Sequence, residues 1–425
     1  MKHKFCLLFS IGLLLSVQSY GQLKVNDPRL VEYRKDYPEL DTLMKNGILT
    51  EKVSGMKYFT GYSYKTLYDW DQYFEGIVQI YMGWPSDYIK NGVLIFLANQ
   101  NDSGFIPRSI PALGYQGLEH VKPFLAQISL MVYKAYGEKD WIMEESKFNK
   151  LKKYLDYWLY NMDINKNGLS EWMSAPHTGM DNQHERAGYW MDRQCEGVDL
   201  NCYLVRECLA FAKLAKLAGK EKLAKEYETI ANERTATIQK YLWDEKDGFF
   251  YDQKLNPKEP MAKSLPGSKL NVLTQNKSRI PVKTVGAFAV IWAGVATPEQ
   301  AKRMITEHLL NPREFWTTYP IPALAKTEQW YSTVPQTGDL GCSWRANTWI
   351  PTNYMMYHAA KNYGYGIVAS AIAQRTNELM LKAGNREYYN SETGEGLGLN
   401  PFWGWSLLGN FFMLEEKLDW DITKL

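Results

Sequence analysis

The sequence predicts an all-α protein, an (α/α)6 toroid in which six helix hairpins close into a ring and long loops gather at one end. Apolar residues recur with the 3.6-residue period of an amphipathic helix through twelve segments, which come in pairs joined by short loops. Longer segments rich in Gly, Trp and Tyr alternate with these pairs, and no Pro/Ser-rich linker divides the chain. We therefore expect one domain over residues 22–425.

Some of the expected helices also carry end signals. Residues 200–218 place Leu204, Phe211 and Leu214 on one face, and Gly219 follows as a C-terminal cap. Residues 297–300 (TPEQ) form a capping box with proline at the first helical position, which predicts a helix from there to about residue 308. The twelve expected helices are 34–46, 71–83, 86–99, 123–137, 143–161, 200–218, 221–242, 284–294, 297–308, 349–362, 365–382 and 403–416. The expected long loops are 57–70, 100–120, 163–198, 243–283, 311–348 and 384–402.

Residues 1–21 have the pattern of a secretory signal peptide. Lys2 and Lys4 precede an apolar run over residues 5–17, and the small residues Ser19 and Gly21 suit signal peptidase. The run is too short for a stable membrane span. We therefore expect an exported protein, periplasmic or secreted, that begins at Gln22 and has no membrane span.

The charge balance argues against nucleic acid as a partner. Of the 49 basic residues, two lie in the expected signal peptide, which leaves 47 basic residues against 47 acidic ones. A nucleic-acid-binding protein normally shows a basic excess. The aromatic content of 14% supplies much of the expected core, and it also suits a cleft in which sugar rings stack on aromatic side chains.

The cysteines and histidines predict neither a metal site nor a cofactor. Cys195, Cys202, Cys208 and Cys342 match no zinc spacing, and the six histidines contain no metal-binding pair. An exported protein can form disulfides, so a Cys195–Cys202 bridge stays open, although buried free thiols are favoured.

Two acidic residues stand in separate loops rich in glycine and aromatic residues. Asp181 lies in HTGMDN (177–182), and Glu387 begins EYYNSETGEGLGLNPFWGWS (387–406). A carboxyl group among Trp, Tyr and Gly is poorly solvated, so its protonated form can persist near neutral pH and donate a proton. Two carboxyls in different surroundings are what glycosidic bond cleavage requires. Each loop alone is better explained by an acid that caps backbone amides, but the two together with the motifs below favour catalysis.

Five segments, in this order, resemble the catalytic domain of glycoside hydrolase family 63 and its relatives, which include mannosylglycerate hydrolases and the family 37 trehalases. They are YDWDQYF (68–74), SGFIPRS (103–109), TGMDN with the later EGVDLNCYL (178–204), SWRANTWIPTNY (343–354) and EYYNSETGEGLGLNPFWGWSLL (387–408). The resemblance implies that Asp181 is the general acid and Glu387 the general base. Glu395 is the nearest rival for the base, and it is expected to contact substrate instead.

The same resemblance implies a set of sugar-binding side chains. Asp71 would accept hydrogen bonds from sugar hydroxyls, although it could instead cap the helix that follows. Arginines in these motifs would orient hydroxyls or a carboxylate, and tryptophans would stack on sugar, although both could serve the scaffold. The expected substrate-binding residues are Trp70, Asp71, Arg108, Asn182, Trp344, Arg345, Glu395 and Trp405.

Departures from the family pattern leave the substrate open. His177 replaces a common glutamate, KPF (122–124) replaces a Gln-Pro-Pro, and QHER (183–186) replaces a Ser-Pro-Arg. His177 and His184 flank Asp181 and are expected to contact substrate rather than a metal.

These observations together predict an inverting hydrolase of α-linked glucosides or mannosides in oligosaccharides, with no cofactor. The alternatives are a sugar epimerase or lyase on the same toroid, which would usually rely on His or Tyr, and a non-catalytic glycan-binding protein.

Overall fold

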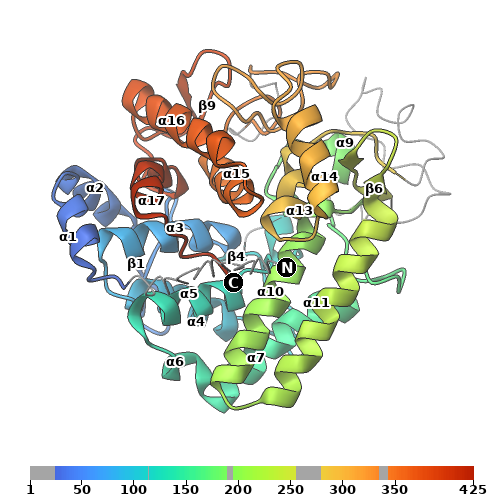
Figure 1. Ribbon diagram of the computed structural model, residues 1–425. Helices are drawn as coiled ribbons and strands as arrows, with labels where there is room; N and C mark the ends of the chain where they lie inside the picture. The colour runs from blue at the N-terminus through green and yellow to red at the C-terminus, as the bar shows by residue number, and fades with distance from the viewer. Residues whose placement is uncertain (1–23, 113, 189–194, 255–278, 335–342) are drawn as a thin grey trace, which may run out of the picture.

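The computed structural model describes residues 24–112, 114–188, 195–254, 279–334 and 343–425, and this part of the chain is mostly helical (Figure 1). The α-helices are α1 (Pro28–Arg34), α2 (Pro38–Met44), α3 (Asp69–Met82), α4 (Asp87–Ala98), α5 (Leu125–Tyr136), α6 (Asp140–Met143), α7 (Glu145–Asp156), α8 (Ala175–Thr178), α9 (His184–Ala187), α10 (Val198–Leu217), α11 (Glu221–Leu242), α13 (Ala289–Trp292), α14 (Pro298–Arg303), α15 (Ile350–Asn362), α16 (Gly366–Ala383) and α17 (Phe412–Leu418).

Shorter elements connect these helices. The 3-10 helices are η1 (Lys45–Gly47), η2 (Gly114–Gly117), η4 (Val285–Phe288) and η6 (Trp405–Asn410), and the π-helical segments are η3 (Tyr157–Asn161) and η5 (Met304–Leu309). The strands are β1 (Ile48–Thr50), β2 (Lys57–Phe59), β3 (Leu67–Tyr68), β4 (Ser109–Ile110), β5 (Cys195–Glu196), β6 (Trp243–Asp244), β7 (Phe249–Phe250), β8 (Gln253–Lys254), β9 (Tyr388–Tyr389) and β10 (Gly396–Leu397). They form five antiparallel two-stranded pairs in the described part of the chain: β1–β2, β3–β4, β5–β8, β6–β7 and β9–β10.

Six helical segments form a closed inner ring. Each one packs against the next, in the order α3, α5, α10, α13, α15 and η6, and η6 then packs against α3. The partners α4, α7, α11, α14 and α16 lie outside this ring (Figure 1). The (α/α)6 toroid that the sequence predicts is therefore confirmed.

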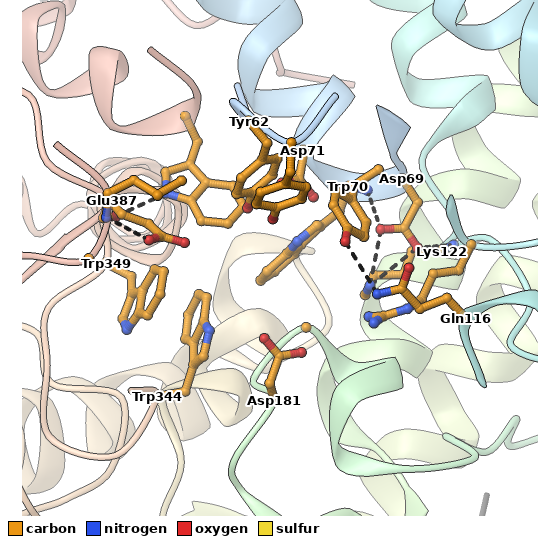
Figure 2. A pocket seen from close by; sticks show the side chains of 17 residues that line it. Tyr62, Asp69, Trp70, Asp71, Gln116, Lys122, Asp181, Trp344, Trp349 and Glu387 are labelled. Carbon is orange, nitrogen blue, oxygen red and sulfur yellow. Dashed lines mark hydrogen bonds and ion pairs between the residues drawn. The ribbon is translucent and has the colours of Figure 1, made fainter. Parts of the chain in front are cut away.

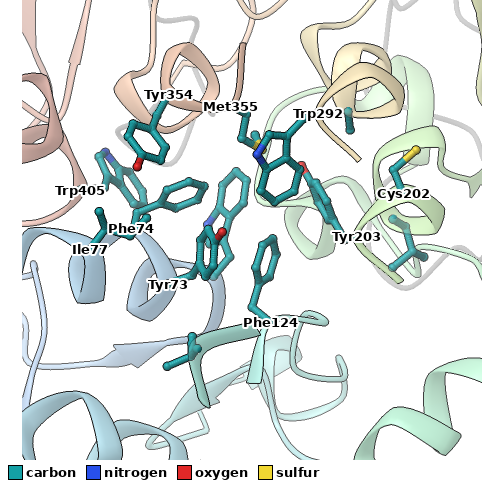
Figure 3. Close-up of a cluster of buried hydrophobic side chains, with 14 of the residues drawn as sticks. Tyr73, Phe74, Ile77, Phe124, Cys202, Tyr203, Trp292, Tyr354, Met355 and Trp405 are labelled. Carbon is teal, nitrogen blue, oxygen red and sulfur yellow. The ribbon is translucent and has the colours of Figure 1, made fainter. Parts of the chain in front are cut away.

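Aromatic side chains fill the centre of the ring. Tyr73 and Phe74 from α3 meet Phe124, which precedes α5, Tyr203 from α10 and Trp292 from α13 (Figure 3). All five are buried. Large apolar rings contribute most of the free energy that burial supplies in such a core, so the inner helices are held around a solid centre.

Backbone contacts between the two ends of the chain close the ring. Gly61, before α3, packs against Gly404, before η6, so closely that a Cβ on Gly61 would overlap the Gly404 backbone. The Trp403 indole N–H donates to the Thr60 carbonyl at 3.0 Å. We call this contact between residues 60–61 and 403–404 the closing seam.

The periodicity predicts most of the helices well, with several differences. Helices α8 and α9 lie within the loop expected over 163–198, and the segment expected as one helix over 284–294 is η4 followed by α13. The seven-residue helix α1 is missing from the prediction, although Asp27 caps it and Pro28 is its first residue. The helix expected over 403–416 is instead η6 followed by α17. Trp405 Nε1 and Ser406 Oγ both donate to the Glu387 carbonyl at 3.1 Å, and these contacts hold the first turn against a distant loop.

None of the described helices combines the length and the apolarity that crossing a membrane requires.

Candidate active site

The loops that enter five of the inner helical segments meet at one cavity of about 370 Å³, a volume within the usual range for small-molecule sites. The described residues that line it are Tyr62, Tyr64, Tyr68, Asp69, Trp70, Asp71, Arg108, Gln116, Lys122, Gly179, Asp181, Trp344, Trp349, Glu387, Gly398, Leu399 and Trp405. These residues precede or begin α3, α5, α10, α15 and η6, so the cavity lies at the N-terminal ends of the ring helices. This arrangement agrees with the expected gathering of loops at one end.

A tight turn presents Asp181 to the cavity. Gly179 ends α8 with φ = 86°, a left-handed conformation that favours glycine. A Cβ at Gly179 would also lie 2.7 Å from the Trp70 ring. Asp181 follows this turn and is half-buried, and its carboxyl group points into the cavity (Figure 2).

Glu387 approaches the cavity from a different wall and is more deeply buried, at 9% exposure (Figure 2). Its Oε2 accepts a hydrogen bond from the Leu399 backbone N–H at 2.9 Å. Gly398, at φ = 68°, permits this contact because a Cβ there would overlap the carboxyl group. Burial raises the pKa of Glu387 to about 7, the Leu399 N–H lowers it, and the charge of Asp181 raises it further. The two carboxyls thus interact electrostatically across the cavity.

Asp71 carries a buried acceptor that no described protein group satisfies. Its side chain is 4% exposed, and Oδ1 has no hydrogen-bond partner. Burial and the neighbouring Asp69 raise the pKa of Asp71 to about 7, while Lys122 and a hydrogen bond from Tyr62 lower it. An unsatisfied buried oxygen costs free energy, and Asp71 is among the residues that line the cavity.

Tryptophans form a continuous wall. The rings of Trp344 and Trp349 stack at 3.7 Å between centroids, and Trp349 in turn stacks on Tyr388 at 4.5 Å. Trp405 meets Trp349 edge-on at 5.8 Å. Trp70 lies 5.7 Å from Trp344. The rings pack on one another and still line the cavity. The sequence left packing in the core and lining of the site as alternatives for these tryptophans, and the structure shows both.

Both cationic side chains in the described lining are ion-paired with buried carboxylates. Arg108 Nε lies 2.9 Å from Glu119 Oε2, and Lys122 Nζ lies 3.0 Å from Asp69 Oδ1. The Lys122 ammonium also lies 5.5 Å from the Trp70 ring centroid. Each cation is therefore neutralised within the wall.

Seven predicted site residues line the cavity: Trp70, Asp71, Arg108, Asp181, Trp344, Glu387 and Trp405. Three others do not. Glu395 is exposed, in the turn between β9 and β10. Asn182 and Arg345 are buried behind the wall, where Asn182 accepts a hydrogen bond from the Trp344 backbone N–H at 2.8 Å and Arg345 Nε donates to the Asn182 carbonyl at 3.4 Å. These contacts join the Asp181 loop to the Trp344 loop.

The two histidines beside Asp181 also lie outside the cavity lining. His177 is fully buried against Trp158, and its Nε2 lies 2.7 Å from the His120 carbonyl oxygen. Burial lowers its pKa well below the ordinary value, so it is a neutral core side chain. His184 is half-buried on α9. The expectation that these two contact substrate has no support in the structure.

Sequence reasoning missed several lining residues, namely Tyr62, Tyr64, Tyr68, Asp69, Gln116, Lys122 and Trp349. Tyr68 and Asp69 lie inside the recognised YDWDQYF motif, and Lys122 stands where the family pattern has a glutamine. This departure from the family pattern could have identified Lys122 as a lining residue, because a substitution beside a site changes the chemistry of the site's wall.

The cysteines that the structure describes are free thiols. Cys195, Cys202 and Cys208 are all buried, and burial raises the pKa of each thiol. The Cys195–Cys202 bridge is therefore absent, and the buried-thiol interpretation is confirmed for these three; Cys342 lies outside the described residues. Among the described side chains, no cluster of three or more His, Cys, Asp or Glu could hold a metal ion.

A ring of helix hairpins with two carboxyl groups facing an aromatic cavity is the arrangement of a helical-toroid glycoside hydrolase. The chain belongs to the mannosylglycerate hydrolase MGH1-like glycoside hydrolase domain family, whose sequence profile matches residues 64–406. This match confirms the resemblance on which the site was first mapped.

Curated relatives match more limited stretches. Mannosylglycerate hydrolase of Thermus thermophilus is 29% identical over 168 residues, which is 39% of this chain and 33% of that protein. A periplasmic trehalase of Escherichia coli is 26% identical over 241 residues, which is 53% of this chain and 36% of that protein. The chain thus spans about a third of the length of these relatives.

Solved structures share the fold. The family 63 mannosylglycerate hydrolase from Thermus thermophilus, in complex with Tris and D-glycerate, superposes with a TM-score of 0.69 at 18% identity, covering 90% of this chain and 100% of that one. The neutral trehalase from Saccharomyces cerevisiae superposes with a TM-score of 0.61 at 18% identity, covering 87% and 76%. At these identities the likeness establishes the toroid alone.

Proposed function

We propose that the protein is an inverting hydrolase that cleaves α-linked glucosides or mannosides. The observation that carries this proposal is the placement of Asp181 and Glu387, which belong to separate loops and face one aromatic cavity. Relatives named as a mannosylglycerate hydrolase and as trehalases support the choice of α-linked glucose or mannose.

The chemistry divides between the two carboxyls. Asp181 donates its proton to the glycosidic oxygen as the bond from that oxygen to the anomeric carbon breaks. Glu387 removes a proton from a water molecule, whose oxygen attacks the anomeric carbon from the opposite face. Asp71, which lines the cavity, accepts a hydrogen bond from a hydroxyl of the glycone, the sugar ring that carries the reacting carbon.

Release of reducing sugar from a panel of α-linked disaccharides tests this function. The wild-type protein should hydrolyse at least one member of the panel. Asp181→Asn and Glu387→Gln should each lower turnover by roughly 10²–10⁴-fold. Glu395→Gln is the matched control, because Glu395 lies in the same loop as Glu387 but is exposed and outside the cavity lining; it should retain near-wild-type turnover.

Other results would point to the alternatives. Binding of an oligosaccharide without release of reducing sugar would indicate a glycan-binding protein. An unsaturated or epimerised product would indicate a lyase or an epimerase. Normal activity of Asp181→Asn on an unactivated disaccharide would remove Asp181 from the acid role.

We also propose that the protein is exported to the periplasm or beyond, on the evidence of the signal-like residues 1–21. Expression of the full chain in a Gram-negative host should give a periplasmic product that begins at Gln22, as read by mass spectrometry. Leu14→Arg, which interrupts the apolar run, should keep the uncleaved chain in the cytoplasm. A cytoplasmic wild-type product that retains Met1 would contradict export.

A further inference from the structure

We infer that the mouth of the cavity, at Tyr64 and Gln116, is a subsite for a neutral sugar ring on the leaving-group side of the scissile bond. This inference rests on the proposed hydrolase function and specifies the class of leaving group. It follows from the depth of the cavity, from the fixed orientation of two mouth residues and from the pairing of the charges in the wall.

The depth of the cavity assigns the mouth to the leaving group. Trp70, Asp71 and Trp405 are buried, Trp70 packs on Phe74 of the aromatic core, and Trp405 lies in the same cluster (Figure 3), so these residues mark the inner end of the cavity. Tyr64, in contrast, is 55% exposed although it lines the same cavity. A pocket closed at its inner end admits the glycone first, so the leaving group must lie toward Tyr64.

The ring of Tyr64 is held in place before any ligand arrives. It stacks on Tyr62 at 4.8 Å between centroids, and it meets Tyr68 edge-on at 6.2 Å. An exposed aromatic ring with a fixed orientation can stack on the CH face of a pyranose with little further loss of side-chain entropy. Tyr64 is therefore a preorganised stacking surface at the mouth.

Gln116 supplies a polar group beside this surface. The β3–β4 pairing sets Tyr68 opposite Ser109, and both side chains then bind the Gln116 amide. Ser109 Oγ donates to Oε1 at 2.7 Å, and Nε2 donates to the Tyr68 hydroxyl at 3.2 Å. Because an amide nitrogen carries two hydrogens, one donor remains for a ligand hydroxyl.

The charges of the described lining residues favour a neutral leaving group. Arg108 and Lys122 already pair with the buried carboxylates Glu119 and Asp69. A leaving group that carried its own carboxylate would compete with these buried pairs, and breaking a buried ion pair is costly. A sugar ring needs only a stacking surface and hydrogen bonds, which Tyr64 and Gln116 offer.

Two substrates with the same glycone test the inference. One is an α-linked disaccharide, and the other is the α-glycosyl fluoride, whose leaving group has no ring. In Tyr64→Ala the ratio of kcat/KM for the disaccharide to kcat/KM for the fluoride should fall about 10-fold, because only the disaccharide loses a stacking partner. Tyr64→Phe keeps the ring and should keep the ratio. Tyr160→Ala is the matched control, since Tyr160 is similarly exposed, at 53%, but lies on η3 outside the cavity lining.

An unchanged ratio in Tyr64→Ala would overturn the subsite and leave the hydrolase function intact. The subsite would also be overturned if the wild-type kcat/KM were more than 10-fold higher for a glycoside whose leaving group is a small carboxylic acid than for the disaccharide. Failure of the wild-type protein to hydrolyse either substrate would instead overturn the hydrolase function on which the subsite depends. Thermal unfolding of each variant establishes that the compared proteins are folded.

Discussion

Asp181→Asn, assayed on an α-glycosyl fluoride, should separate the acid from the base. Fluoride departs without protonation, so hydrolysis of this substrate needs the base but not the acid. With Glu387 as the base, Asp181→Asn should remain active on the fluoride while it loses roughly 10²–10⁴-fold on a disaccharide. Glu387→Gln should be impaired on both substrates.

The pKa of Glu387 sets the expected pH dependence. A general base must be ionised, so kcat/KM for the fluoride should rise with pH and level off above about 7, the pKa to which burial raises this carboxyl. At pH 5 about 1% of Glu387 would be ionised, which places kcat/KM about 100-fold below the plateau. In Asp181→Asn the midpoint should move down, because the neighbouring negative charge is gone.

Coulomb's law gives the size of this change in the pKa of Glu387. For carboxyls about 8 Å apart in an effective dielectric constant of about 20, the interaction is about 2 kcal/mol, or about 1.5 pH units. Asp181 is the smallest of the three causes of the pKa shift, after burial and the Leu399 N–H, so we expect a change of this size or less. Initial rates of fluoride hydrolysis from pH 4 to pH 9 measure the midpoints of the wild-type protein and of Asp181→Asn. Loss of fluoride hydrolysis in Asp181→Asn with retention in Glu387→Gln would reverse the two roles and refute the reasoning.

Four further outcomes are expected. Proton NMR of fresh product should show the β-anomer first, because a single displacement inverts an α-glycoside; early α-anomer would exclude Glu387 as a general base. A crystal structure with a bound inhibitor should place the carboxyls of Asp181 and Glu387 ~6.5–9.5 Å apart, and a much longer separation would reopen the base assignment. Glu387→Gln should raise the free energy of unfolding at pH 8 by up to about 3 kcal/mol and change it little at pH 4.5. The pKa of this carboxyl is higher in the native protein than in the unfolded chain, so ionisation destabilises the wild-type protein as pH rises from the unfolded pKa toward 7, and the amide removes that effect. Equal melting temperatures of the two proteins at pH 8 would contradict this. Gly398→Ala should lower kcat at least about 10-fold with the circular dichroism spectrum retained, because its Cβ overlaps the Glu387 carboxyl, and full activity would show that the loop relaxes.

The sequence predicts the ring better than it predicts the wall of the cavity. Helix periodicity and caps are local, so helices of both the inner and the outer ring could be placed from their own residues, as the capping box that begins α14 illustrates. The pairing of Lys122 with Asp69 joins residues 53 positions apart, and no local pattern reveals it. The same limit applies to Gln116, which is hydrogen-bonded at the cavity to Ser109 and Tyr68, two residues that face each other across the β3–β4 pair.

The choice between Glu387 and Glu395 shows where local reading fails. Both lie in one glycine-rich loop, and both are followed by short strands that pair as β9 and β10. The pairing leaves Glu395 in the exposed turn, while the Leu399 N–H holds Glu387 at the cavity. Family resemblance favours Glu387, and the hairpin places Glu387 in the cavity lining and Glu395 outside it. Asn182 and Arg345 lie inside the resembling motifs, which predict sugar contact, and in the structure they brace two loops outside the cavity lining.

The closing seam has a consequence for when the site can exist during folding. The cavity takes Asp71 from near the start of the described chain and Trp405 from near its end, and Gly61 must dock on Gly404 before these walls meet. Contacts between residues more than 340 positions apart form late, because the entropy of closing so long a loop opposes them. A growing chain therefore carries the acid motif before it has an active site, and we expect catalytic competence to be acquired when the seam closes rather than gradually. A refolding experiment that follows activity and helix content together should find helix first and turnover only when the seam closes.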